Sequence, residues 1–217
     1  MKPTTLRPVL LWSPLNDGTL PWLNELAAAL TSGGCQLVLL TTDPRHDKAQ
    51  FPIFEVPFCL PEYPARFKVT NRSGGLPADL ARDLAERSRA WWGQPGESLD
   101  SHSTAAQSAA NLFTRLLRRL QPACILTWGS SLPQSIILQH LAERQRIPSF
   151  VLERGLFAGT LMIDQRGHGG RSDLNTSLAA RALAESPLFV ASVRMDIPRP
   201  SRSWRKLEAT STDIASR

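Results

Sequence analysis

Four short apolar runs, separated by helical patterns, most constrain what this 217-residue chain can fold into. They occupy residues 8–13, 36–41, 123–128 and 149–152 and read PVLLWS, QLVLLT, ACILTW and SFVL. Apolar runs of this length between turn residues are typical of strands that are buried on both faces. Strands that alternate with helices form βαβ units with parallel strands. We therefore predict an α/β fold: a single Rossmann-like parallel sheet of about five or six strands, with helices on both faces.

The helical patterns begin and end at recognisable signals. A first helix is expected from about Leu20, with Thr19 as its N-cap, to the glycines that begin at Gly33. A second helix is expected from Pro77, and a long amphipathic helix over residues 100–120.

The chain divides into one main domain and a polar end. Residues 1–187 form the predicted domain, and its Pro-rich segment 51–75 is expected to be a mobile loop. The beginning of that segment, 51–58, also suits an edge strand, where Pro is tolerated. Residues 188–197 read as a last strand, and 198–217 are polar and aperiodic, as in a disordered tail.

The charge pattern limits the kinds of partner. The net charge is +6, and all but four of the 25 basic residues are Arg, which binds phosphate and carboxylate groups bidentately. Half of the net charge follows Leu188, so the domain itself is mildly basic and we expect no nucleic-acid partner. Transmembrane and signal-peptide patterns are missing, so we predict a cytoplasmic protein with at most a peripheral contact with the inner membrane.

Motifs for cofactors and metals are missing too. The loop after the first apolar run reads SPLNDG, which lacks the G-x-G-x-x-G fingerprint, and there is no Walker A motif. Cys35, Cys59 and Cys124 are far apart and read as buried free thiols. We expect no cofactor and no metal. A serine hydrolase centred on Ser130 is disfavoured, because G-x-S-x-G is missing.

The stretch 124–170 is where we expect a ligand site, because open α/β sheets bind ligands at the carboxyl ends of their strands. Ser130 and Ser131 precede a helix, and either can cap it or contact an anion at its N-terminus. Glu153 follows one apolar run, and Asp164 ends the next, TLMID. Two such carboxylates can converge on one crevice and serve glycosyl chemistry: one handles protons, and the other is a nucleophile or stabilises positive charge at the anomeric carbon.

Other interpretations of these residues stay open. Arg154 and Arg166 can neutralise a phosphate or an acidic sugar, but they can equally form a salt-bridged loop with the two carboxylates. Trp91 and Trp92 can stack on a sugar ring, although core packing at a helix end is the more common role. His140 reads as a structural histidine with its hydrogen bonds satisfied.

One motif adds a resemblance. The chain reads PSFVLERGL from Pro148, then GTLMID from Gly159, followed by Gly167 and Ser172. This pattern, with the strand and helix before it, resembles the capsule polysaccharide biosynthesis family over roughly residues 85–178. That family includes proteins of bacterial capsule synthesis and export, among them retaining Kdo transferases that use a CMP-activated sugar.

The resemblance implies a GT-B-type glycosyltransferase fold with strand-end acids in a cleft between two domains. It implies Glu153 and Asp164 as catalytic acids, with Gly155 and Gly167 shaping their loops. The candidate substrate-binding residues are Ser130, Ser131, Arg154, Gly155, Arg166, Gly167 and His168.

A transferase with two such domains is nearly twice as long as this chain, so the resemblance implies the N-terminal lobe alone. It implies a nucleotide-sugar donor and a glycan acceptor, with a second lobe or partner protein to complete the site. We therefore expect the isolated chain to lack transferase activity. The alternative is a truncated or reduced homologue that acts as a non-catalytic, glycan- or protein-binding module.

Overall fold

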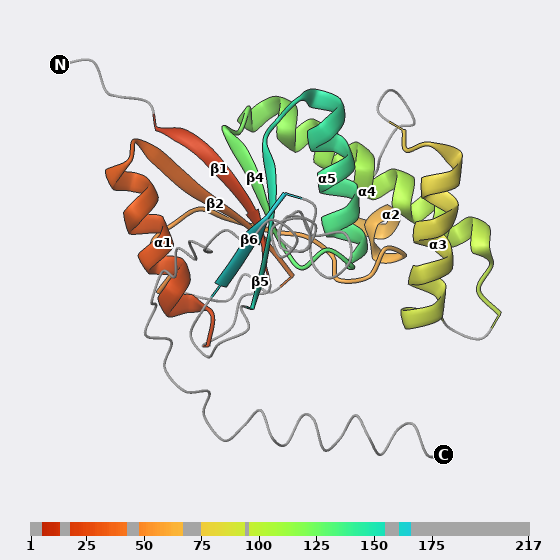
Figure 1. Cartoon of the computed structure of the whole chain (residues 1–217). Coiled ribbons are helices and arrows are strands. Elements are labelled where there is room, and N and C mark those ends of the chain that lie inside the picture. The colour runs from red at the N-terminus through yellow and green to blue at the C-terminus, as the bar shows by residue number, and fades with distance from the viewer. Residues whose placement is uncertain are drawn as a thin grey trace, which may run out of the picture.

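The structure is a computed structural model, and it describes residues 6–13, 18–42, 48–66, 75–93, 96–154 and 161–165. Six strands form one sheet in the order β3-β2-β1-β4-β5-β6 (Figure 1). The strands are β1 (Arg7–Trp12), β2 (Cys35–Thr41), β3 (Ile53–Glu55), β4 (Cys124–Trp128), β5 (Ser149–Arg154) and β6 (Leu161–Asp164). The helices are α1 (Leu20–Ser32), α2 (Glu62–Arg66), α3 (Ala78–Trp92), α4 (Leu99–Leu120) and α5 (Pro133–Gln145).

The predicted α/β fold is confirmed, because β1, β2, β4 and β5 nearly coincide with the four apolar runs and pair in parallel. The predicted edge strand is β3, which pairs in parallel with β2 at one end of the sheet. The segment 51–75, expected as a mobile loop, holds β3 and α2 and buries Val56, Leu60 and Tyr63. Residues 67–74 lie outside the described part of the chain.

The last described strand differs from the parallel sheet that the sequence predicted. β6 pairs antiparallel with β5. Residues 155–160 alone join the two strands, and a parallel crossover needs about a dozen residues or more. The connection is therefore long enough only for a hairpin, and β6 runs back along the edge of β5.

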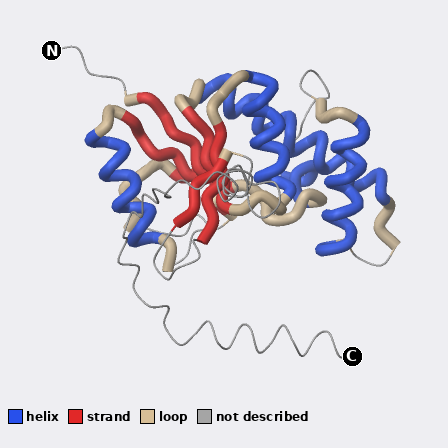
Figure 2. Tube along the Cα trace, viewed as in Figure 1, coloured by secondary structure: helices blue, strands red, loops and turns tan. Residues whose placement is uncertain are grey.

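Helices cover both faces of the sheet (Figures 1 and 2). α1 packs on one face, where Leu23 and Trp22 contact a core that includes Leu11 and Leu39. α4 and α5 lie on the other face, with α2 and α3 outside them, around a larger core that includes Phe113. We call these faces the α1 face and the α5 face. Because side chains alternate along a strand, β1, β2 and β4 each supply residues to both cores.

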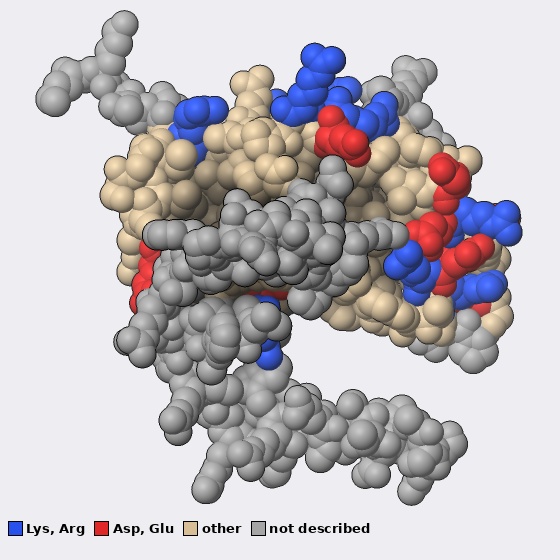
Figure 3. Space-filling view, in the orientation of Figure 1, with Lys and Arg blue, Asp and Glu red and all other residues tan. Residues whose placement is uncertain are grey.

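The charged surface is mixed over α3 (Figure 3). Arg82 pairs with Glu86 at 3.1 Å, and Arg87 pairs with Asp83 at 2.9 Å, both one helical turn apart. Such exposed pairs contribute little stability, about 0.3–0.5 kcal/mol each. No helix in the described ranges is both long and apolar enough to cross a membrane.

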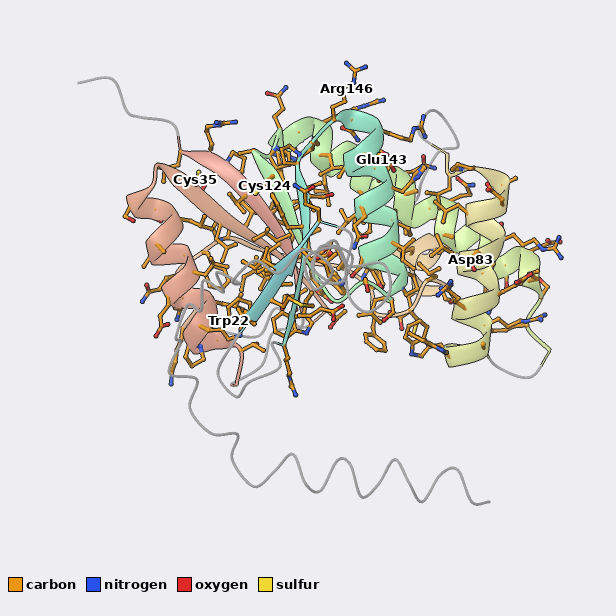
Figure 4. All side chains as sticks on the ribbon, viewed as in Figure 1. Trp22, Cys35, Asp83, Cys124, Glu143 and Arg146 are labelled. Carbon is orange, nitrogen blue, oxygen red and sulfur yellow. The ribbon has the colours of Figure 1, made fainter. Side chains whose placement is uncertain are left out.

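The three cysteines are free thiols, as predicted, but they are half-buried rather than fully buried. Cys35 and Cys124 begin β2 and β4, at the edge of the sheet where the strands start (Figure 4). Burial, and then the nearby Cys35, raises the pKa of the Cys124 thiol, while Arg7 opposes that shift. A thiol that stays protonated is a poor nucleophile, so Cys124 is not activated for covalent chemistry.

Candidate functional site

The loop between β4 and α5 is anchored to the neighbouring strand. β4 ends at Trp128, and Gly129 then takes a positive φ of 73°, which glycine adopts without a Cβ clash. The Gly129 N–H donates to the Leu152 carbonyl oxygen on β5 at 2.9 Å. The loop that carries Ser130 and Ser131 therefore starts from a fixed point beside β5.

Ser130 contacts the first candidate catalytic residue. Its hydroxyl donates to Glu153 Oε1 at 3.3 Å, a long hydrogen bond between two half-buried side chains. The expectation that Ser130 or Ser131 caps α5 is wrong, because Leu132 is the N-cap residue and makes no side-chain capping bond. The Ser130 hydroxyl bonds to Glu153 instead, and Ser131 is exposed.

The hairpin places the second candidate acid on the same face as the first. In the β5–β6 register, Glu153 lies opposite Met162, and Val151 lies opposite Asp164. Residues two apart on a strand share a face, so Glu153 and Asp164 are diagonal neighbours, typically about 7–8 Å apart. Asp164 is 6% exposed, whereas Glu153 is half-buried. The antiparallel direction of β6 thus brings the two acids together more directly than parallel strand ends do.

Residues of β4 hold this part of the sheet against helices on both faces. Thr127 is fully buried on the α5 face, where it accepts a hydrogen bond from Gln139 Nε2 at 3.0 Å. Trp128 points to the α1 face and packs against Trp22, with ring centroids 5.5 Å apart. The strand before the Ser130 loop is therefore rigidly placed, and so is the start of that loop.

A set of buried hydroxyl groups near the carboxyl ends of the strands was missed by sequence reasoning. Ser13 follows β1, Thr41 ends β2 and Thr127 lies near the end of β4, and all three are fully buried. The signal was in the sequence, because three of the four apolar runs carry Ser or Thr at or next to their last position. These groups make the sheet polar at the C-terminal ends of its parallel strands, although the strands themselves are apolar.

The remaining predicted site residues are only partly within the described chain. Arg154 is exposed, and it belongs to the α1 face of β5, opposite to the face that carries Glu153. Gly155, Arg166, Gly167 and His168 lie outside the described residues. Among the ranges that the structure describes, no group of three or more His, Cys, Asp or Glu is placed to hold a metal ion.

Two comparisons by sequence find no match. No protein-family model matches the chain. No curated protein matches it significantly.

Comparisons by structure find partial likenesses. The glycosyltransferase SsfS6 of Streptomyces sp. SF2575 matches 68% of this chain at 18% identity, with a TM-score of 0.36. The glycosyltransferase VinC, in complex with dTDP, matches 65% at 18% identity and a TM-score of 0.35. A UDP-GlcNAc 2-epimerase from Neisseria meningitidis matches 70% at 14% identity and a TM-score of 0.30.

This chain spans 39%, 33% and 33% of the length of those three structures, in the same order. At such identities and TM-scores, the likenesses carry no argument about what this chain does. The function has to be argued from the site itself and from the motif that carries it.

Proposed function

We propose that this chain is a glycosyltransferase-like domain of bacterial capsular or surface polysaccharide biosynthesis. In this proposal, it takes part in sugar transfer from an activated, CMP-Kdo-like donor to a glycan acceptor when a second lobe completes the site. The observation that carries the proposal is the contact of Ser130 with Glu153 at the carboxyl edge of the sheet, with Asp164 on the same face. The motif that contains both acids supports it.

The two acids differ in exposure, and this suggests different roles. Glu153 is half-buried beside a hydroxyl donor, which suits a group that exchanges a proton with substrate. The long hydrogen bond to Ser130 is of a kind that often tightens only when substrate is bound. Asp164 is nearly buried, which suits a fixed negative charge that stabilises positive charge at the anomeric carbon.

The other proposed contacts are with the substrate. Ser131 and Arg154 are exposed at the same end of β4 and β5, where they are available to a phosphate or acidic sugar. Arg166 and His168 would add to this set, with Gly155 and Gly167 shaping the loops.

A non-catalytic binding module is the second candidate. The observation that favours it is the 6% exposure of Asp164, because a carboxylate so buried also suits a structural role that holds the hairpin in place. In that case the chain binds a glycan or a protein without transferring a sugar.

Calorimetric titration of CMP and of CMP-Kdo into the chain tests the proposal. Binding is the readout because we expect no turnover from this chain alone. We expect CMP-Kdo to bind, and Glu153→Gln to weaken binding about tenfold or more, since a hydrogen bond to a charged group contributes about 1.5–3 kcal/mol. The CMP titration shows how much of the affinity comes from the nucleotide alone.

The matched control is Glu143→Gln. Glu143 is an exposed carboxylate on α5, near the end of the helix that is remote from the Ser130 loop (Figure 4). The same change of charge there should leave CMP-Kdo binding at the wild-type level. If the wild-type chain binds neither CMP nor CMP-Kdo, the binding-module interpretation replaces the proposal.

A further inference from the structure

Three aromatic side chains form a group near the end of α3, and two of them, Phe58 and Trp91, are exposed while Trp92 is half-buried. We call Phe58, Trp91 and Trp92 the aromatic shelf. The centroids of the Trp91 and Trp92 rings are 5.4 Å apart, those of Phe58 and Trp92 are 5.3 Å apart, and both pairs meet edge to face. Trp91 is 53% exposed and Phe58 is 48% exposed, so the expected core packing is wrong for Trp91. Exposed large aromatic side chains in one group mark a binding surface.

The Phe58 side of the shelf is tied to the first turn of α5. The buried Gln134 side chain donates through Nε2 to the carbonyl oxygens of Pro57, at 3.1 Å, and Phe58, at 2.7 Å. Gln134 follows directly on the loop that carries Ser130, the hydrogen-bond partner of Glu153. The backbone at Phe58 is therefore hydrogen-bonded to the first turn of α5, the helix that follows the Ser130 loop.

The tryptophan side is held by a buried polar chain. His102 contacts Ser88 Oγ through Nδ1 and Glu97 Oε2 through Nε2, each at 3.0 Å. Ser88 lies one helical turn before Trp92 on α3, and His102 is in the first turn of α4. Ser88 and His102 are fully buried, so neither can meet a substrate, whereas the Glu97 side chain is 33% exposed. They position the end of α3 and with it the two tryptophans.

The shelf and the site lie at the same end of the molecule. α3 runs in the same sense as the parallel strands, so its C-terminal end lies on the side where those strands end and α5 begins (Figure 1). A long glycan bound at Glu153 that extends across this end of the molecule toward α3 would therefore run toward the aromatic side chains.

We propose that the aromatic shelf binds the ring face of a neutral sugar residue in a glycan. The C–H groups on one face of a pyranose are apolar and weakly positive, and they match the negative π face of an aromatic ring. Glu62 and Glu97 lie close enough to Cys59, next to Phe58, to help raise the pKa of its thiol after burial does so. Those carboxylates disfavour a phosphate or an acidic sugar on the Phe58 side of the shelf.

The inference rests on the proposed function, because it names the surface where the glycan acceptor of that reaction would extend. It also states which part of the glycan is recognised: a neutral unit removed from the reacting end. The donor remains at the acids, where the Ser130 loop and Arg154 are the candidate contacts.

Titration of the full chain with cello-, malto- and chito-oligosaccharides, followed by calorimetry, tests the shelf. We expect at least one of these neutral glycans to bind. Trp91→Leu keeps an apolar side chain but removes the aromatic face, so we expect it to weaken binding about three- to tenfold. Trp91→Tyr keeps an aromatic face and should retain most of the affinity.

The control is Arg82→Ala, an exposed change on the same helix that should bind as the wild type does. The inference is overturned if none of the three glycans binds, or if Trp91→Leu binds as tightly as Trp91→Tyr. It is also overturned if the chain self-associates in sedimentation and Trp91→Leu abolishes this, because the shelf is then an interface between two copies.

Titration of CMP-Kdo into the same variants separates the two proposals. Trp91→Leu should bind CMP-Kdo as the wild type does, and Glu153→Gln should bind the neutral glycan as the wild type does. If CMP-Kdo fails to bind while glycan binding depends on Trp91, the shelf stands and the transferase proposal falls.

Discussion

His140 is a half-buried imidazole on α5 whose Nε2 atom has no hydrogen-bond partner within the described residues. The expectation of a satisfied structural histidine is therefore wrong for this atom. Burial lowers the pKa of His140 most, and the positive charge of Arg144, one turn along the helix, lowers it further. Glu143 and Asp79 act in the opposite direction but do not outweigh these effects.

This shift predicts how stability depends on pH. The pKa of His140 is lower in the folded protein than its unfolded value of about 6.5, so the unfolded chain binds a proton first as the pH falls. The contribution of neutral His140 to the free energy of unfolding is fully present above about pH 6.5. It is lost as the pH falls from that value toward the pKa of His140 in the folded protein. We expect the urea midpoint of His140→Gln to fall less than that of the wild type between about pH 7 and pH 5. Equal slopes in both proteins would contradict this, and all other histidines are common to both.

At the level of single residues, the sequence indicated which side chains carry chemistry, but it did not indicate which side chains contact each other. The two acids were identified from their places after apolar runs, but the contact of Ser130 with Glu153 was not. A serine after a strand and before a helix is usually a cap, and only the folded distance between two loops decides which acceptor it bonds to. Trp91 has the spacing of a core residue, yet 53% of its side chain is exposed.

At the level of elements, α3 ends at Gly93, where the Arg89 residue leaves no room for a Cβ. The Gly93 N–H donates to the Arg89 carbonyl oxygen at 2.9 Å, and a Cβ on Gly93 would overlap that oxygen and the Arg89 side chain. We expect Gly93→Ala to lower the free energy of unfolding by about 1–3 kcal/mol, as other overpacking changes do. Urea denaturation followed by circular dichroism measures this.

Gly33, at the end of α1, provides the matched control. A Cβ there has an ordinary contact of 3.5 Å with the Leu30 carbonyl oxygen, and φ is −87°, which alanine adopts readily. Gly33→Ala should therefore stabilise the protein by about 0.4–1 kcal/mol through the unfolded state. If both substitutions shift the urea midpoint in the same direction, the expected overlap between a Cβ at position 93 and Arg89 is contradicted.

The order of the elements could be predicted because each apolar run and each amphipathic pattern is a local signal. The direction of β6 could not be read from that pattern, since a buried strand looks the same in either direction. The length of the connection, residues 155–160, carries the information, because only a hairpin is short enough. The position of β3 at the sheet edge was predictable for a similar reason: Pro52 and Pro57 flank it and lack the N–H that a central strand needs.

At the level of the whole molecule, the sheet separates two cores of unequal size. The larger core lies on the α5 face and includes residues from α3, α4 and α5, whereas the smaller one is formed mainly with α1. The candidate acids lie on the face of the larger core, at the edge strand pair β5–β6. The helices that hold the Ser130 loop and the aromatic shelf belong to that same core, so its packing positions both sites.

The two cores should contribute to stability independently. Leu23 is fully buried in the smaller core and Ile137 in the larger one, on opposite faces of the sheet. We expect Leu23→Ala to cost about 2–5 kcal/mol and Ile137→Val about 0.5–1.5 kcal/mol in free energy of unfolding, because each leaves a cavity. The double variant should lose the sum to within about 0.5 kcal/mol, as separated sites do. Urea denaturation of the wild type, the two single variants and the double variant measures the interaction energy between the two sites. An interaction energy above about 0.5 kcal/mol would contradict independence and mean that the sheet transmits strain from one core to the other.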